Sequence, residues 1–370
     1  MRRLTTGLVG LAVSAVLIGV VLLEVNPGAA AATLAKAQPL VLLLVLPLLA
    51  LDQTARTIRW HLLLAHEPRP GYRETLRYLL VGYLVNIVLP GRLGEFVRAH
   101  LAGTRAHVGQ LRALGSIALE RGLDLVSAAT LGAIASAAAG LGNAITGAFT
   151  LVAALGWIVL LTVTLVPHDL VRRLLDWGVA RFSRGPARLV LPHLGSFGHA
   201  LIDAAAPRLV VAASGLTLIS WATGTAVFAI VAGSLGIPVP PIVLLAMVTA
   251  ANLGAAIPSA PAGVGPFEFA VVYVGTAAGL DGSQALALGI LAHLVGVVPV
   301  AAAGALSLPS VDWRLAELRN LGALRRGAAV DPGTDDPEPA APPDVGGPSG
   351  PGLLACSNAT DGGAGRRAAR

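Results

Sequence analysis

The chain has 370 residues, of which 55% are hydrophobic and only 12% are charged. A soluble globular domain carries about 25% charged residues, so this composition excludes an ordinary soluble enzyme. The net charge of +6 does not indicate nucleic-acid binding, because the mean hydropathy is +0.75. Several apolar stretches reach the roughly 20 residues that a membrane-crossing helix needs, and the sequence predicts an all-α polytopic membrane protein.

Six apolar stretches are long enough for full crossings, and two more are interrupted by proline and glycine. The predicted crossings are residues 7–24, 39–59, 113–140, 143–166, 209–234 and 284–308. The interrupted segments are residues 76–104 and 241–280. Small residues at 29–32 would also suit a signal-peptide cleavage site. We favour an uncleaved first helix, because a protein with many spans needs no removable signal.

The positions of the arginines predict the orientation of the chain. They cluster at residues 2–3, 56–77, 105–112, 172–208 and 314–326, whereas the connections between these clusters contain only Lys36. Positively charged residues stay on the cytoplasmic side, so all five clusters and both termini should face the cytoplasm. Each interrupted segment must then leave and return on one side, as a re-entrant hairpin. The first hairpin is predicted to enter from the cytoplasm and the second from outside.

The sequence predicts two parts. Residues 1–310 form the transmembrane domain. Residues 311–370 begin with a basic stretch that can rest on anionic headgroups, and continue as a Pro/Gly/Ala-rich cytoplasmic tail that cannot build a core and should be disordered. The single cysteine, Cys356, excludes a disulfide framework and a multi-cysteine metal site. The use of arginine in place of lysine is typical of GC-rich bacterial genes, so we expect a bacterial cell membrane.

The two interrupted segments share an order of residue types: asparagine, proline, paired glycines and glutamate. The first break contains Asn86, Pro90, Gly91, Arg92, Gly94, Glu95 and, one turn later, Arg98. The second contains Asn252, Gly263, Gly265 and Glu268. Interrupted helices in matching positions of two halves indicate a transporter's binding site, and the free N–H groups of the second half-helix attract anions. Alternatively, Pro and Gly only kink packed helices while the asparagines bond the freed backbone; two matched breaks favour a binding site.

Ionisable residues also occur at membrane depth. Asp124 lies twelve residues after Arg112, about 18 Å along a helix, and Glu120 and Arg121 precede it closely. Such residues are costly in a membrane unless they are paired, so they mark either a functional site or a structural ion pair. The two interpretations are equally favoured. Structural pairs would join Arg121 to Glu95, or Arg59 to Asp124.

Three further features have simpler interpretations. Asp52, Arg56 and Arg59 share one helix face. His293, near the middle of the last span, could relay protons, but a hydrogen-bonded structural role is favoured. The hydroxyls of Ser220, Thr223 and Thr225 are interpreted as helix-packing groups.

Four motifs together carry a family resemblance. They are Arg-Trp at 59–60, LPGRLGEFVR at 89–98, ERGLD at 120–124 and PSAPAGVGPFE at 258–268. This set resembles the lysylphosphatidylglycerol synthase transmembrane-region family, also called flippase-like, over about residues 1–310. The resemblance implies two re-entrant hairpins and a protein that handles lipids. Fused members of that family move aminoacylated phosphatidylglycerol after a separate soluble domain makes it, and we expect that activity to be absent because the tail is too short for the domain.

The sequence therefore predicts a transporter that moves a phosphate-bearing lipid, aminoacylated or polyprenyl, across the cytoplasmic membrane. Arg92 or Arg98 and the hairpin N-termini would hold the phosphate, while Glu95, Asp124 and Glu268 balance charge or meet a cationic headgroup. No catalytic residue, cofactor, metal or nucleic-acid partner is predicted. The chain has no Walker A motif, so movement would be downhill, ion-coupled or driven by a partner.

Two other functions remain open. One is a membrane glycosyl- or phospho-transferase for polyprenyl lipids, using Glu120, Asp124 or Glu268 with a metal. The other is a scaffold for a separate lipid-modifying enzyme, with the tail as its interaction arm.

Overall fold

The computed structural model describes residues 2–64, 70–89, 92–106, 108–182, 191–257 and 259–311. Within these ranges the regular elements are helices and no strand occurs, which confirms the all-α prediction. The helices are α1 (Arg2–Glu24), α2 (Pro27–Leu34), α3 (Pro39–Leu42), α4 (Val45–Leu63), α5 (Tyr72–Val88), α6 (Gly94–Arg105), α7 (Gln110–Ala138), α8 (Asn143–Leu165), α9 (His168–Phe182), α10 (Leu191–Ala204), α11 (Pro207–Ser234), α12 (Pro241–Gly254), α13 (Pro266–Ala277) and α14 (Gly282–Ser307). Two 3₁₀ turns are η2 (Pro261–Gly263) and η3 (Leu308–Val311). The predicted tail lies outside the described residues except for Val311.

Four helical segments are long and apolar enough to cross a bilayer. They are Pro39–Leu63, which joins α3 and α4, then α8, α11 and Gly282–Val311. A fifth candidate is the pair α1 and α2, which bends by 90° between its two helices. Each coincides with a predicted crossing. The sixth prediction, residues 113–140, corresponds to the 29-residue helix α7. The charged residues of α7 lower its hydropathy, so its crossing stays a prediction.

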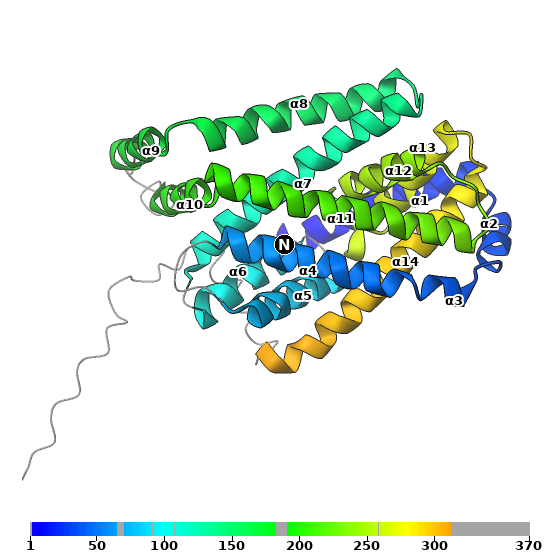
Figure 1. The fold of residues 1–370 in the computed structure, drawn as a ribbon, viewed down its shortest axis with the longest axis horizontal. Coiled ribbons are helices and arrows are strands. Elements are labelled where there is room, and N and C mark those ends of the chain that lie inside the picture. The colour runs from blue at the N-terminus through cyan, green and yellow to red at the C-terminus, as the bar shows by residue number, and fades with distance from the viewer. Residues whose placement is uncertain are drawn as a thin grey trace, which may run out of the picture. The chain divides into compact units, whose positions relative to one another are not determined.

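The two predicted interruptions are present. The first separates α5 from α6, and the second separates α12 from α13, with η2 between them. Figure 1 shows α6 toward the end of the helical bundle where α9 and α10 lie, and α13 toward the end where α2 lies. The two helical hairpins thus lie toward opposite ends of the bundle.

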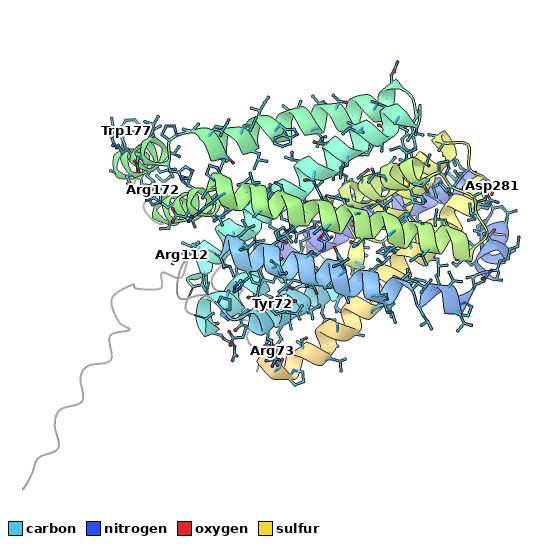
Figure 2. All side chains as sticks on the ribbon, viewed as in Figure 1. Tyr72, Arg73, Arg112, Arg172, Trp177 and Asp281 are labelled. Carbon is cyan, nitrogen blue, oxygen red and sulfur yellow. The ribbon has the colours of Figure 1, made fainter. Side chains whose placement is uncertain are left out.

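The polar stretch before α11 contains two helices that the sequence analysis did not assign, α9 and α10. Figure 1 shows α9 end-on while α8 and α11 run across the view, so α9 lies crosswise to its neighbours. Leu170, Leu174 and Trp177 are exposed on α9 at spacings of four and three residues. An ion pair between Arg172 and Asp203 joins α9 to α10. Figure 2 places Arg112 and Arg172 at one end of the bundle and Asp281 at the other.

Two apolar clusters form most of the core. The larger combines buried side chains of α7, α8 and α11–α14, including Met247, Val231 and Leu288. The second combines α4, α5, α6 and the start of α7 around Trp60 and Leu79. Because α7 contributes to both clusters, the charged segment in its middle lies between the two clusters.

The legs of the first hairpin approach very closely. A Cβ atom on Gly94 would lie 1.8 Å from the carbonyl oxygen of Gly82 in α5, and a Cβ on Gly82 would lie 2.4 Å from the Arg98 side chain. Small residues permit such backbone contact between membrane helices. The second hairpin repeats this feature, since a Cβ on Gly254 would lie 2.6 Å from the carbonyl oxygen of Pro266.

Gly94→Ala should therefore separate the legs and lower the free energy of unfolding by about 1–3 kcal/mol, the usual range for overpacking. Thermal unfolding of the purified protein in detergent measures this effect. Gly122→Ala is the matched control, because a Cβ there meets nothing within 4 Å. Equal stability of the two variants would show that the hairpin legs are not in contact.

Candidate functional site

The first break is closed by Asn86. Its side-chain Oδ1 accepts a hydrogen bond of 2.7 Å from the backbone N–H of Gly94, at the start of α6. Arg92 follows the break with φ of 55°, a left-handed conformation that is unfavourable for a residue with a Cβ. Pro90 and Gly91 lie outside the described residues. The asparagine thus bonds a freed backbone group, as the kink interpretation expects, and the strained Arg92 marks the turn as unusual.

The second break is held from two sides. Gly265 adopts φ of 99°, and its N–H donates to Glu268 Oε2 at 2.7 Å. Ser14 of α1 accepts from the N–H of Ala260 at 2.8 Å and donates to the carbonyl of Val264 at 2.7 Å. Asn252 does not bond the loop, because its Nδ2 donates to the carbonyl of Val248 in its own helix. The two breaks therefore match in sequence order but not in the role of their asparagines.

Arg92 joins the two breaks. Its Nη2 donates to the carbonyl oxygen of Ala255, the residue after α12, at 3.3 Å. Arg92 is exposed, and no ion pair is recorded for it within the described part of the chain. The structure thus brings an exposed cation, without an ion pair among the described residues, to the point where two interrupted helices meet.

A network of six charged side chains lies beside this point. Glu120 of α7 receives Arg59 of α4 at 3.2 Å, Arg98 of α6 at 2.9 Å and Arg121 at 3.0 Å. Asp124 receives Arg59 at 2.5 Å and Arg121 at 3.3 Å. The third carboxylate is Glu95, whose Oε1 lies 3.2 Å from Arg121 Nε. The network thus contains three arginines and three carboxylates, and its formal charges sum to zero. Both pairings expected from the sequence are therefore present.

Burial divides this network into an inner and an outer part. Arg59 and Glu120 are 0% exposed, and Arg98 is 1% exposed with its guanidinium 4.1 Å from the Trp60 ring centroid. The side chains of Glu95, Arg121 and Asp124 are 22%, 28% and 19% exposed. Fully buried charges must be paired, so the inner group is committed to internal contacts. Of the two proposed phosphate ligands, the geometry favours Arg92 over Arg98.

Glu268 has a second partner that the sequence analysis named separately. His293 of α14 places Nδ1 2.5 Å from Glu268 Oε1 and Nε2 3.2 Å from the carbonyl oxygen of Ala262. Ala262 has φ of 62°, so a strained residue of the second break is bonded to this histidine. The Phe267 ring stacks on the His293 ring with centroids 4.3 Å apart. The hydrogen bonds expected for His293 are present.

A small polar cavity of about 70 Å³ lies between α4, α11 and α12. Its lining includes the Asp52–Arg56 ion pair, with a contact of 2.8 Å, and Asn252. Ser220 and Trp221 also line it, and their Oγ and Nε1 atoms are buried without a hydrogen-bond partner. The sequence analysis interpreted Ser220 as a packing hydroxyl and missed Trp221, because no pattern around them signals a cavity.

A larger apolar groove of about 360 Å³ borders the second break. Leu17, Ala148, Phe149, Ala270 and Tyr273 are among its lining residues, from α1, α8 and α13. Gly254, Ile257 and Pro266, at the edges of the second break, line it as well. Since Gly254 directly precedes Ala255, the groove begins next to the carbonyl that Arg92 contacts.

Comparisons with known proteins place the chain in a family. The chain is 25% identical over 334 residues to "Glycosyltransferase AglD" of Haloferax volcanii, covering 80% of this chain and 52% of that protein. The chain thus spans about half the length of this relative. No solved structure matches the chain of this protein. A sequence model of the family described as "Lysylphosphatidylglycerol synthase TM region" matches residues 7–304. With its several apolar helices, the chain is a multi-pass membrane protein and belongs to the lysylphosphatidylglycerol synthase TM region family.

Proposed function

We propose that this protein moves a phosphate-bearing lipid across the cytoplasmic membrane, with the headgroup at the two helix breaks. The observation that carries this proposal is the contact between Arg92 and Ala255, which puts an exposed guanidinium, with no ion pair among the described residues, where the breaks meet. A guanidinium binds phosphate through two parallel hydrogen bonds. Glu95 and Asp124 are partly exposed nearby, and a cationic headgroup would compete with Arg121 for them.

The acyl chains fit the apolar groove. It starts beside the headgroup position, at Gly254 and Pro266, and continues along α8 and α13. A lipid with its phosphate at Arg92 would therefore place its chains against apolar side chains while the headgroup crosses. Alternation between the two sides would follow from rearrangement of the two hairpins, which lie toward opposite ends of the bundle (Figure 1).

Filling the groove should slow lipid movement. Ala148→Trp places a large ring in it, and excluding only two CH₂ groups of a chain loses about 1.6 kcal/mol, or roughly tenfold in occupancy. The measurement is the movement of fluorescent phosphatidylglycerol in proteoliposomes. Ala154→Trp is the control, because Ala154 is exposed on the same helix but does not line the groove. Equal rates for both variants would contradict the groove assignment, and an inactive unmodified protein would contradict lipid movement.

We also propose the predicted orientation, with both termini and α9 on the cytoplasmic side and two re-entrant hairpins. After replacement of Cys356, single cysteines should react from outside at Lys36, Asn143, Ile237 and Asp281. Cysteines should react only from inside at Arg69, Arg184 and Arg326, which lie outside the described residues. Labelling of a cysteine at Arg105 from outside would show that the first segment crosses the membrane and is not re-entrant.

A second candidate function is glycosyl transfer to a polyprenyl lipid, which the name of the Haloferax relative favours. The carboxylates proposed for it are already occupied, since Glu120 and Asp124 bind arginines and Glu268 binds His293. No group of three potential metal-binding side chains occurs within the described ranges. Transfer of labelled sugar from a nucleotide sugar to polyprenyl phosphate by the purified protein would establish this function.

The scaffold role is distinguished by the tail. A variant that lacks residues 315–370 should still move lipid if the protein is a transporter. Loss of lipid movement together with loss of a copurifying enzyme would instead indicate that the protein works by recruiting that enzyme.

A further inference from the structure

The contacts of His293 indicate which of its ring nitrogens carry a hydrogen. Its Nε2 faces the carbonyl oxygen of Ala262 at 3.2 Å, and a carbonyl can only accept a hydrogen bond, so Nε2 carries a hydrogen. Its Nδ1 faces Glu268 Oε1 at 2.5 Å. A neutral imidazole with its hydrogen on Nε2 would present a lone pair to a carboxylate oxygen at that distance. A second hydrogen, between Nδ1 and Oε1, satisfies both contacts at once.

We infer that Glu268 and His293 form a proton-binding site that couples the conformation of the second break, and with it lipid movement, to protonation. This inference goes beyond the proposed function in naming the coupled ion, and it rests on that function only for the coupling to lipid. The proton-binding step itself stands on the geometry of Glu268, His293 and Ala262.

Loss of the shared proton has a defined structural consequence. Either the remaining hydrogen of His293 moves to Nδ1, which breaks the bond to Ala262, or the Glu268 carboxylate moves away from the ring. The first change releases Ala262 from its left-handed conformation, and the second removes the hydrogen bond that caps Gly265 at 2.7 Å. Both changes loosen the loop between α12 and α13. The proton therefore stabilises the loop conformation that the structure shows.

No other charged group among the described residues forms an ion pair with Glu268 or His293. Among the helices packed on α14, α2 has no charged residue, and α11 has only Arg208 in its second position. Arg73, Glu74 and Arg77 occupy the first two turns of α5, whereas α14 meets the later residues Leu80 and Leu84 through Gly304, eleven residues beyond His293. The remaining charged or titratable groups of α4, α5 and α13 are Asp52, Arg56, Arg59, His61, Tyr72, Tyr78, Tyr83 and Tyr273. Asp52 and Arg56 pair with each other, and Arg59 belongs to the six-membered network.

The loop between α12 and α13, which the proton stabilises, also contacts Arg92 and borders the apolar groove. Ala255 accepts from Arg92 at the start of the loop, and Pro266 lines the groove at its end. A change of loop conformation between these residues would alter the headgroup position and the groove entrance together. Protonation of this site would therefore change lipid binding through the loop.

Glu268→Gln tests the role of the proton, because it keeps the hydrogen bonds and removes the carboxyl group that binds the proton. The amide Nε2–H can donate to His293 Nδ1, and the amide oxygen can accept from Gly265, so every contact is kept without a shared proton. We expect the melting temperature of the unmodified protein to fall when the pH is raised from about 5 to 9. This fall should be at least 3 °C larger than the fall for the Glu268→Gln protein. His199→Gln, which removes a partly exposed pair with Asp176, should keep the full pH dependence. A Glu268→Gln protein with the same pH profile as the unmodified protein would overturn the inference.

Lipid movement gives the second readout. The unmodified protein should move fluorescent phosphatidylglycerol at rates that change at least threefold over the same pH range, while Glu268→Gln moves it at one rate throughout. If Glu268→Gln removes the pH dependence of stability but the unmodified protein moves no lipid, the proton site stands and the proposed function fails. If lipid moves but both proteins share one pH profile in both assays, the proposed function stands and the proton site is wrong.

Discussion

Arg92→Ala should abolish most lipid movement while leaving the protein folded. Arg92 is exposed and makes one bond of 3.3 Å to the carbonyl oxygen of Ala255, so its loss leaves no buried charge unpaired. A hydrogen bond to a charged phosphate contributes about 1.5–3 kcal/mol, which corresponds to a fall of roughly 10- to 100-fold in the rate. Arg92→Lys should recover only part of the activity, because an ammonium group is a point charge without the two-pronged geometry of guanidinium.

The assay for Arg92 combines fluorescent-lipid movement in proteoliposomes with thermal unfolding of the same samples. Arg73→Ala is the matched control, because Arg73 is an exposed arginine of the same hairpin at the far end of α5. Glu95 and Glu120, which could have held Arg92 structurally, are bound to other arginines. Normal lipid movement by well-folded Arg92→Ala protein would move the headgroup site to the second break, around residues 263–268.

Glu120→Gln should have the largest effect on stability. Glu120 is 0% exposed and receives Arg59, Arg98 and Arg121, so its neutralisation leaves one uncompensated positive charge inside the protein. Breaking a buried ion pair on one side lowers the free energy of unfolding by about 3–5 kcal/mol. Unfolding in mixed micelles measures this loss, and the double variant with Arg98→Met should recover much of it.

The control for Glu120 is Asp203→Asn, which breaks the Arg172–Asp203 pair at the protein surface. The arginine side chain of that pair is 47% exposed, so the loss should be below about 1 kcal/mol. A Glu120→Gln protein that is no less stable than Asp203→Asn would mean that water or lipid headgroups reach the network, and the inner charges would then be available for binding.

Some of this arrangement could be predicted from the sequence because its signals are local. Hydropathy located the long helices, and proline with paired glycines located both breaks. The pairings of Arg59 with Asp124 and of Arg121 with Glu95 were foreseeable, since unpaired charges at membrane depth are too costly to remain. The helices α9 and α10 were missed because both are short and lie in a stretch whose arginines gave it a polar character.

The rest depends on contacts between distant segments. Arg92 and Arg98 looked equivalent, being six residues apart in one basic motif, yet only Arg98 lies under Trp60 and against Glu120. Glu268 and His293 were both named, but nothing in their separation of 25 residues indicates that α13 and α14 place them 2.5 Å apart. The polar cavity around Ser220 and Trp221 had no local signal.

The charge network also constrains how the protein is made. Arg59 precedes its partner Asp124 by 65 residues, which a ribosome adds in about 3–13 s at 5–20 residues per second. During that interval α4 contains an arginine at a position that is buried only in the finished protein, with an insertion penalty of about 2.5–3.5 kcal/mol if it lies at mid-membrane. We therefore expect α4 to stay beside the insertion machinery, or to keep Arg59 at the cytoplasmic surface, until α7 supplies Asp124.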